Sequence, residues 1–247
     1  MLRKLFKLIS LGVIMATLMS VILGCEDIDK RTTEAITQQL SEKYGESFTV
    51  SSLGNRIGRD TATAYVIADA NPTLRFTVRI DKNGNLVFDD YAYRTVCRKT
   101  EEMLQCIFTS VGVEVLSYCN YDRMDTTVSL AVTPLEYMEV TASTFLSVTF
   151  IIKDTGTVDA STIIEAIQTF YTNLGSPLLR VNIYALSEED YSCVYDKVLM
   201  ETQIFNTHRL ESYGAANADR KITFQFSSEG PSIPLRKINE MFDKEAN

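Results

Sequence analysis

The sequence predicts an α+β fold, in which antiparallel sheets carry helices packed on one face and form two sequential α+β units. Strand-like segments alternate between apolar and polar residues, as in residues 74–80 and 222–226. This alternation indicates a sheet with one buried face and one wet face, whereas parallel strands buried on both faces read as continuous apolar runs. Amphipathic helices separate the strands, and 247 residues are more than one small domain needs. A doubly wound parallel sheet is therefore disfavoured.

Residues 1–24 have the pattern of an export signal. Arg3, Lys4 and Lys7 precede an apolar run over residues 8–23. A membrane-spanning helix needs about 20 apolar residues. This run is shorter and is followed by acids rather than by a basic flank, which indicates a cleaved signal peptide instead of a transmembrane anchor.

The end of the apolar run carries a motif of its own, namely Ile22, Leu23, Gly24 and Cys25. It resembles the lipobox of bacterial lipoproteins, in particular those of Gram-positive bacteria. The resemblance implies cleavage between Gly24 and Cys25, and diacylglycerol attached to the Cys25 thiol. A second acyl chain such as palmitate makes membrane binding firm, because each buried methylene contributes about 0.8 kcal/mol.

The residues after Cys25 predict where the anchored chain is held. Glu26 and Asp27 follow it directly, and an acid at this place favours retention at the cytoplasmic membrane. We therefore expect a lipid-anchored protein at that membrane, facing outside the cytoplasm. Residues 25–31 form a tether of at most roughly 25 Å, so the folded part is expected to lie near the bilayer.

Residues 32–109 are expected to form the first α+β domain. Thr32 or Thr33 caps its first helix, and Asn83 with Gly84 supplies the positive φ angles of a tight hairpin turn. Strands are expected at residues 48–53, 62–68, 74–80 and 86–90, and a second helix at residues 92–108. The segments KYGESF and RIDKNGNLVFDDY resemble small α+β modules of Gram-positive lipoproteins, which implies the same fold class.

Residues 112–247 are expected to form the second α+β domain, after a junction at residues 109–112. Asp159 begins one amphipathic helix, and Ser187 with Asp190 begins another. Strands are expected at residues 113–118, 127–133, 146–152, 178–185 and 221–226, and helices at residues 159–174, 187–205 and 233–242.

Charge and cysteine content exclude several classes of protein. The formal net charge is −8, and loss of three basic residues with the leader leaves 21 basic against 32 acidic side chains, or −11. Such a surface repels nucleic acid, so no nucleic-acid partner is expected. No two cysteines have the C-x-x-C spacing of a zinc ribbon or a thioredoxin-like site. Disulfides can form outside the cytosol, and any pairing stays open, except that helical spacing places Cys97 and Cys106 on opposite faces.

Catalytic and metal-binding signatures are weak. The single histidine, His208, has no zinc or hydrolase motif to join. Residues 81–92 imitate a calcium loop, but Gly84 stands fourth and Ala92 twelfth, where an EF-hand needs glycine sixth and glutamate twelfth. We therefore expect no catalytic residue, no metal and no cofactor other than the diacylglycerol on Cys25.

These observations favour a non-enzymatic binding or interaction module of the cell envelope, anchored by its lipid and partnered by a protein or peptide. Tyr121 lies in the polar stretch at residues 120–125 and is the candidate for contact with that partner, since tyrosines are enriched at interfaces. Two alternatives stay open. One is a cell-envelope hydrolase that uses acidic residues, and the other is the solute-binding component of a transporter.

Overall fold

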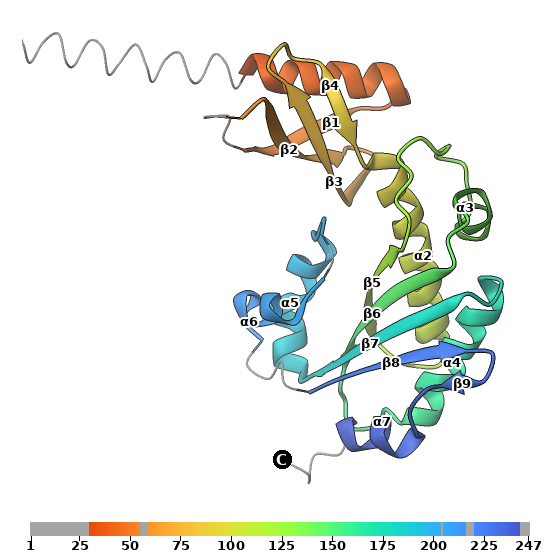
Figure 1. Cartoon of the computed structure of the whole chain (residues 1–247). Helices are drawn as coiled ribbons and strands as arrows, with labels where there is room; N and C mark the ends of the chain where they lie inside the picture. Colours follow the sequence, from red (N-terminus) through yellow and green to blue (C-terminus); the bar gives the residue numbers. More distant parts are fainter. Residues whose placement is uncertain (1–29, 55–58, 204, 216–219, 243–247) are drawn as a thin grey trace, which may run out of the picture. The chain divides into compact units, whose positions relative to one another are not determined.

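The computed structural model describes residues 30–54, 59–203, 205–215 and 220–242 (Figure 1). The residues predicted to form a signal peptide and a lipobox, with Gly24 and Cys25 among them, lie outside the described residues. Within the described ranges, no helix is both long enough and apolar enough to cross a membrane.

The chain divides into two compact units at Asp90. The first contains the residues up to Asp89, except Thr73–Phe76, which group with the second. The sequence analysis placed this boundary at residues 109–112, after the helix that follows Asp90, whereas the structure places it before that helix. Helix α2 (Tyr91–Ser110) belongs to the second unit because it packs against strand β5 (Val115–Tyr121) and helix α4 (Ala160–Asn173) of that unit.

The first unit pairs a helix, seen over residues 30–44, with a four-stranded sheet. Its strands lie in the order β1-β2-β3-β4 and have the bounds β1 (Phe48–Leu53), β2 (Thr61–Ala68), β3 (Asn71–Asp81) and β4 (Leu86–Asp89). The buried and half-buried residues of β2 alternate without a break, as predicted for a sheet with one face covered. Gly84 turns the β3–β4 hairpin with a φ of +88°, and the Asp81 carboxylate accepts the backbone N–H groups of Asn83 and Asn85, both at 2.8 Å.

The second unit contains a five-stranded sheet in the order β5-β6-β7-β8-β9. The remaining strands are β6 (Phe145–Lys153), β7 (Leu178–Leu186), β8 (Lys221–Ser227) and β9 (Gly230–Pro231). The α+β prediction is confirmed, but β6 and β7 are parallel while the other pairs are antiparallel. A parallel pair needs a crossover connection, and α4 provides it.

Helices cover both faces of this second sheet. Helices α2, α4 and α7 (Leu235–Phe242) share one apolar core with alternate residues of the strands. Helices α5 (Glu188–Leu199) and α6 (Thr207–Tyr213) pack on the other face, where Tyr118 and Ile151 lie in the core. Figure 1 shows the two sets of helices on opposite sides of the strands. The sequence analysis did not predict the second helix layer. Strand β6 is consistent with helices on both faces, because every residue of Val148–Ile152 is buried.

One predicted strand is wrong. Residues 127–133 form turns, and helix α3 (Pro134–Thr141) follows at once. Thr133 caps α3 by accepting the Glu136 backbone N–H, while the Glu136 side chain accepts the Thr133 N–H in return. This reciprocal capping box, with proline in the first helical turn, outweighs the alternation of Val128 and Val132. Both valines are half-buried against the core from the loop.

Candidate functional site

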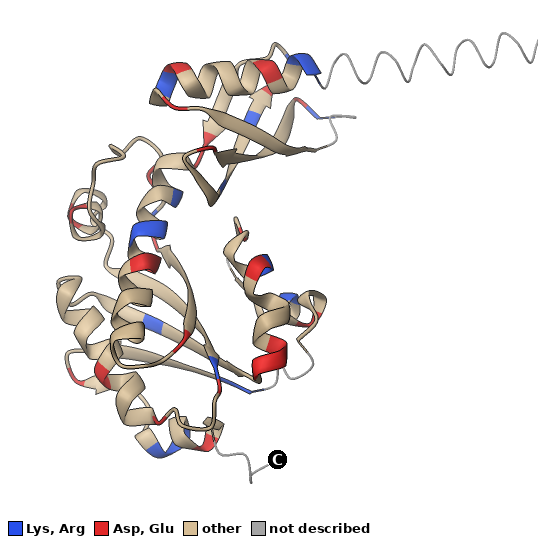
Figure 2. Cartoon of the chain, turned by 180° about the vertical axis from the view of Figure 1, so that it is seen from behind, with Lys and Arg blue, Asp and Glu red and all other residues tan. Residues whose placement is uncertain are grey.

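Three buried charged residues of the second unit lie together on helix α2, beside the edge strand β5. Arg94, Arg98 and Glu101 follow one stripe of α2, since they are four and three residues apart. Their exposed fractions are 2%, 9% and 2%. We call these three residues, with Tyr118 and Cys119 of β5, the α2–β5 cluster. Figure 2 shows basic residues in the first half of α2 and acidic residues after them.

Glu101 lies at the centre of the cluster and takes the place of a missing neighbour strand. Its Oε1 accepts the backbone N–H of Cys119 at 3.1 Å, and its backbone oxygen accepts the Ser117 hydroxyl at 2.8 Å. Strand β5 has only β6 as a strand neighbour, so its outward N–H groups need other partners. The Arg98 Nη1 lies 3.1 Å from Glu101 Oε2, and the Arg94 Nη2 lies 3.5 Å from Oε1. The two arginines thus balance the carboxylate that closes the edge.

Tyr93 closes the same edge one step further along. Its hydroxyl accepts the backbone N–H of Tyr121 at 3.2 Å. Tyr121 is itself only 5% exposed, and its hydroxyl shares a hydrogen bond of 2.6 Å with Thr100. The expectation that Tyr121 is an exposed partner contact is therefore contradicted. Tyr121 ends β5 rather than lying in a loop, and its ring packs against Tyr137 of α3 at 4.8 Å between centroids.

The electrostatics of the cluster favour a charged Arg94. Burial opposes this charge, but the attraction of Glu101 holds the pKa of Arg94 well above its usual value. Burial raises the pKa of the Glu101 carboxyl, and the two arginines oppose that rise. The guanidinium of Arg94 lies over the Tyr118 ring, 5.0 Å from its centroid, in a cation–π contact. Among the described residues, Nε and Nη1 of Arg94 and the Tyr118 hydroxyl find no hydrogen-bond partner.

Arg98 extends the cluster to the helices on the other face of the sheet. Its Nη2 donates to the carbonyl oxygen of Leu199 at 3.1 Å and to that of Thr73 at 3.0 Å, both within the second unit. Leu199 ends α5, so Arg98 satisfies an orphan carbonyl of that helix. One guanidinium thereby holds α2 and α5 together.

This arrangement performs structural work rather than catalysis. A general acid or base must reach a substrate proton, and Glu101 is enclosed, with its Oε1 accepting the Cys119 N–H and two arginines paired with its carboxylate. Burial also raises the pKa of the Cys119 thiol well above its usual value, which suppresses the reactive thiolate. Nearby, Glu201 accepts hydrogen bonds from Arg209 and from the Tyr213 hydroxyl. Across the described ranges, no group of three His, Cys, Asp or Glu side chains is placed to hold a metal ion.

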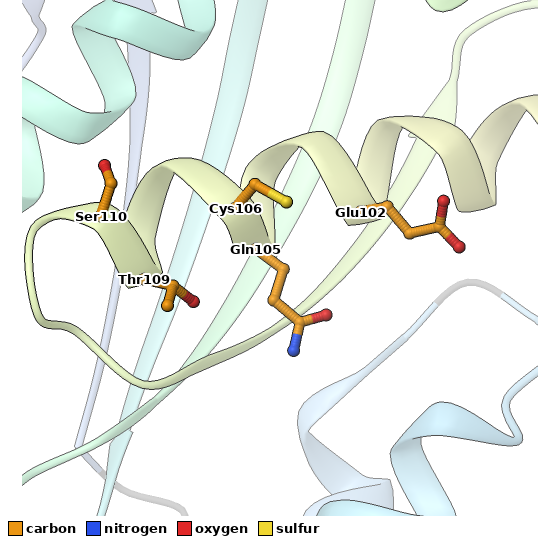
Figure 3. Close-up of a pocket in the computed structure, with 5 residues that line it drawn as sticks. All are labelled: Glu102, Gln105, Cys106, Thr109 and Ser110. Atoms are coloured by element: carbon orange, nitrogen blue, oxygen red, sulfur yellow. The ribbon is translucent and has the colours of Figure 1, made fainter.

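A hollow of about 530 Å³ lies on the outer side of α2. Figure 3 shows that the lining residues all come from this one helix. They are Glu102, Gln105, Cys106, Thr109 and Ser110. Glu102 is the one charged member of this set, so the hollow lacks the converging carboxylates that glycoside hydrolysis requires.

Exposed apolar side chains gather around α3. We call Met124, Leu135, Val140 and Leu178 the α3 surface, with exposed fractions of 54%, 40%, 68% and 39%. Met124 is held against α3, because the Tyr137 hydroxyl donates to the oxygen of Arg123 and accepts the N–H of Asp125. Leu178 donates its N–H to Thr144, just beyond α3. Gly175 makes room for Leu135, whose Cδ1 would lie 2.7 Å from a Cβ at that position.

The helix that carries His208 and the role of the α2–β5 cluster were not predicted from the sequence. His208 is exposed in the first turn of α6, because α5 already ends at Leu199 and a second helix begins at Thr207. Sequence reasoning did not identify Arg94 and Arg98, nor the structural role of Glu101. Their spacing of four and three residues places them on one side of a helix, which the sequence shows. Their contact with the edge of β5 depends on the tertiary structure, which the sequence does not show.

Fold and site together define an α+β protein whose buried charges close a sheet edge and whose exposed apolar side chains gather at α3. No protein-family model matches the chain, and no curated protein matches it. A solved structure with a similar fold is that of a DUF5037 family protein from Ruminococcus gnavus ATCC 29149, with a TM-score of 0.67 and 15% sequence identity. The match covers 85% of this chain and 98% of that one. At this identity the likeness shows the fold alone.

Proposed function

We propose that this chain is an extracytoplasmic lipoprotein, anchored to the cytoplasmic membrane through Cys25, that acts as a non-enzymatic binding module for an envelope protein or peptide. The anchor rests on the lipobox Ile22-Leu23-Gly24-Cys25. The helix of the first unit is already formed at residue 30, five positions after Cys25, so the module works close to the bilayer.

The anchor is tested by fatty-acid labelling. Cells expressing the full chain incorporate labelled fatty acid into it, and the Cys25→Ala variant loses both the label and the processing at that bond. Cys106→Ala is the matched control, because Cys106 is an exposed cysteine elsewhere in the chain and its loss leaves labelling intact. Unchanged labelling of Cys25→Ala contradicts the anchor.

The α3 surface is the observation that supports partner binding. Exposed apolar side chains around one short helix are candidates for an interaction site. The hydrolase alternative has weaker support, since Glu101 and Glu201 are both engaged by arginines. The solute-binding alternative is also weaker, because the hollow on α2 is lined by a single helix.

Partner binding is tested by photo-crosslinking in cells. A photoreactive residue in place of Val140 is expected to give one discrete adduct, which Leu135→Asp abolishes. The control position is Lys221, which is exposed at the opposite end of the same sheet. Equal or absent adducts from the two positions contradict the proposal that the α3 surface binds the partner.

A further inference from the structure

Two cysteines meet in the core between α2 and β5. Cys97 and Cys119 both have an exposed fraction of 0%. The Cys119 thiol donates to the carbonyl oxygen of Cys97 at 3.3 Å. The Cys119 thiol of β5 therefore lies against the backbone of Cys97 in α2, although the two residues are 22 apart in sequence.

We propose that Cys97 and Cys119 form a disulfide that joins α2 to β5 when the chain folds outside the cytosol. The inference rests on the extracytoplasmic location in the proposed function, because disulfides persist in oxidising compartments. The remaining described cysteines are worse partners. Cys106 is exposed on the outer side of α2, and Cys193 is exposed on α5, across the sheet.

The bond forms by thiol–disulfide exchange with a disulfide-bearing oxidant. One cysteine, as its thiolate, attacks the oxidant and gives a mixed disulfide, and the first thiol of the oxidant leaves. The second cysteine then attacks the mixed disulfide, and the second thiol of the oxidant leaves. Overall, the cysteines lose two protons and two electrons, and the oxidant becomes two thiols. Burial hinders this exchange in the folded chain, so the bond is made during folding, before α2 covers β5.

The disulfide would strengthen the attachment of α2 to the edge of β5. Glu101 and Tyr93 already tie α2 to the backbone of β5 through Cys119 and Tyr121. A covalent link at the same place restricts the unfolded chain by closing the intervening loop. We expect reduction to lower the melting temperature by roughly 5–10 °C.

The test uses the Cys106→Ser/Cys193→Ser variant of the full chain, which keeps Cys97 and Cys119 and the anchor. Membranes are denatured, alkylated without reductant and digested, and the peptides are measured by mass spectrometry. We expect a linked peptide that contains both cysteines and lacks two hydrogen atoms. In a second arm, the purified chain is refolded with oxidised glutathione as the oxidant. Adding Cys97→Ser or Cys119→Ser removes the link in both arms and leaves the other thiol free to react.

The two arms separate the disulfide from the location. If fatty acid labels Cys25 while Cys97 and Cys119 are fully alkylated in cells, the disulfide is contradicted and the anchor stands. If the link forms with glutathione but neither the link nor the label appears in cells, the pairing is supported and the proposed location fails. Full alkylation of both thiols in both arms overturns the inference.

Discussion

At the scale of single residues, the buried charges of α2 act as a unit. Glu101 replaces backbone partners for β5, and Arg94 and Arg98 keep its carboxylate paired. The sequence analysis identified the helix caps Asp159 and Ser187, because a cap depends on only three or four consecutive residues. It did not predict the role of Glu101, because the backbone group that this side chain satisfies lies on a strand elsewhere in the sequence.

Loss of Glu101 tests this unit. Glu101→Ala is expected to lower the free energy of unfolding by about 3–5 kcal/mol, because it leaves two buried guanidinium groups without their counter-charge. Glu102→Ala, the exposed neighbour on the same helix, is the control and changes stability by less than about 0.5 kcal/mol. Urea unfolding measures both variants. Similar free energies of unfolding for Glu101→Ala and Glu102→Ala would show that the cluster adds nothing to stability.

The cap at Asp159 gives a pH-dependent prediction. Hydrogen bonds from the Ser161 hydroxyl, the Thr162 N–H and the Thr162 hydroxyl lower the pKa of Asp159 from 3.8 to about 2. A depressed pKa means that the stabilisation is complete above the unfolded-state value and is lost as the pH falls from about 4 towards 2. Asp159→Ala is expected to cost about 1 kcal/mol at neutral pH.

Asp159→Asn separates the cap from its charge. Asparagine caps helices as well as aspartate does, so this variant keeps most of the stability at neutral pH. It also lacks the additional loss between pH 4 and 2 that Asp159 produces. Thermal unfolding across this pH range compares the two, and parallel curves for wild type and Asp159→Asn would refute the assignment.

At the scale of elements, every edge of the two sheets carries a feature that discourages pairing with another strand. Strand β1 is bulged between Val50 and Ser52, and β9 has only two residues, of which Pro231 is one. The other two edges are closed by helix side chains. Gln39 serves β4 by donating to Gly84 and accepting from Leu86, at 2.7 and 2.8 Å. Bulges, short strands and prolines blunt exposed edges in natural sheets.

Gln39 provides the matched test for this role. Gln39→Ala is expected to lower the stability of the first unit by about 1–3 kcal/mol, since a backbone donor and a backbone acceptor both lose their partner. Gln38→Ala is the control, because Gln38 is exposed and bonds only to Glu42 on the same helix among the described residues. Hydrogen exchange at the Leu86 amide should quicken in the first variant and not in the second. Equal exchange rates would argue against edge closure by Gln39.

The elements also show how far sequence patterns reach. Alternation predicted β3 and β8 because each of them has one covered face and one more exposed face. The parallel pair of β6 and β7 was missed, since pairing direction depends on the crossover through α4 and not on the strands themselves. The boundary at Asp90 was missed for a similar reason, because only packing shows which sheet α2 covers.

At the scale of the whole molecule, the net charge opposes the proposed attachment to a membrane. Without the predicted leader, the chain carries 32 acidic and 21 basic side chains. An anionic membrane surface repels such a chain, so the proposed lipid anchor would have to supply the attachment.

Vesicle binding measures this opposition. The lipidated chain is expected to sediment with anionic vesicles, whereas the processed chain made without lipid stays in the supernatant at low salt. Raising the salt concentration should not strengthen binding of the lipid-free chain beyond a trace, because screening removes repulsion without adding attraction. Firm binding of the lipid-free chain would show that the folded part has a membrane contact of its own.

Side-chain closure of the sheet edges has a consequence for proteins held on a surface. Molecules confined to a plane meet each other far more often than the same number in solution, and exposed strand edges then seed ordered polymers. The Gln39 amide and the Glu101 carboxylate each bond to backbone groups at the edge of a sheet. An added β-strand would do the same but would expose a new edge of its own. If the chain is anchored as proposed, closed sheet edges would keep neighbouring copies from pairing through their strands.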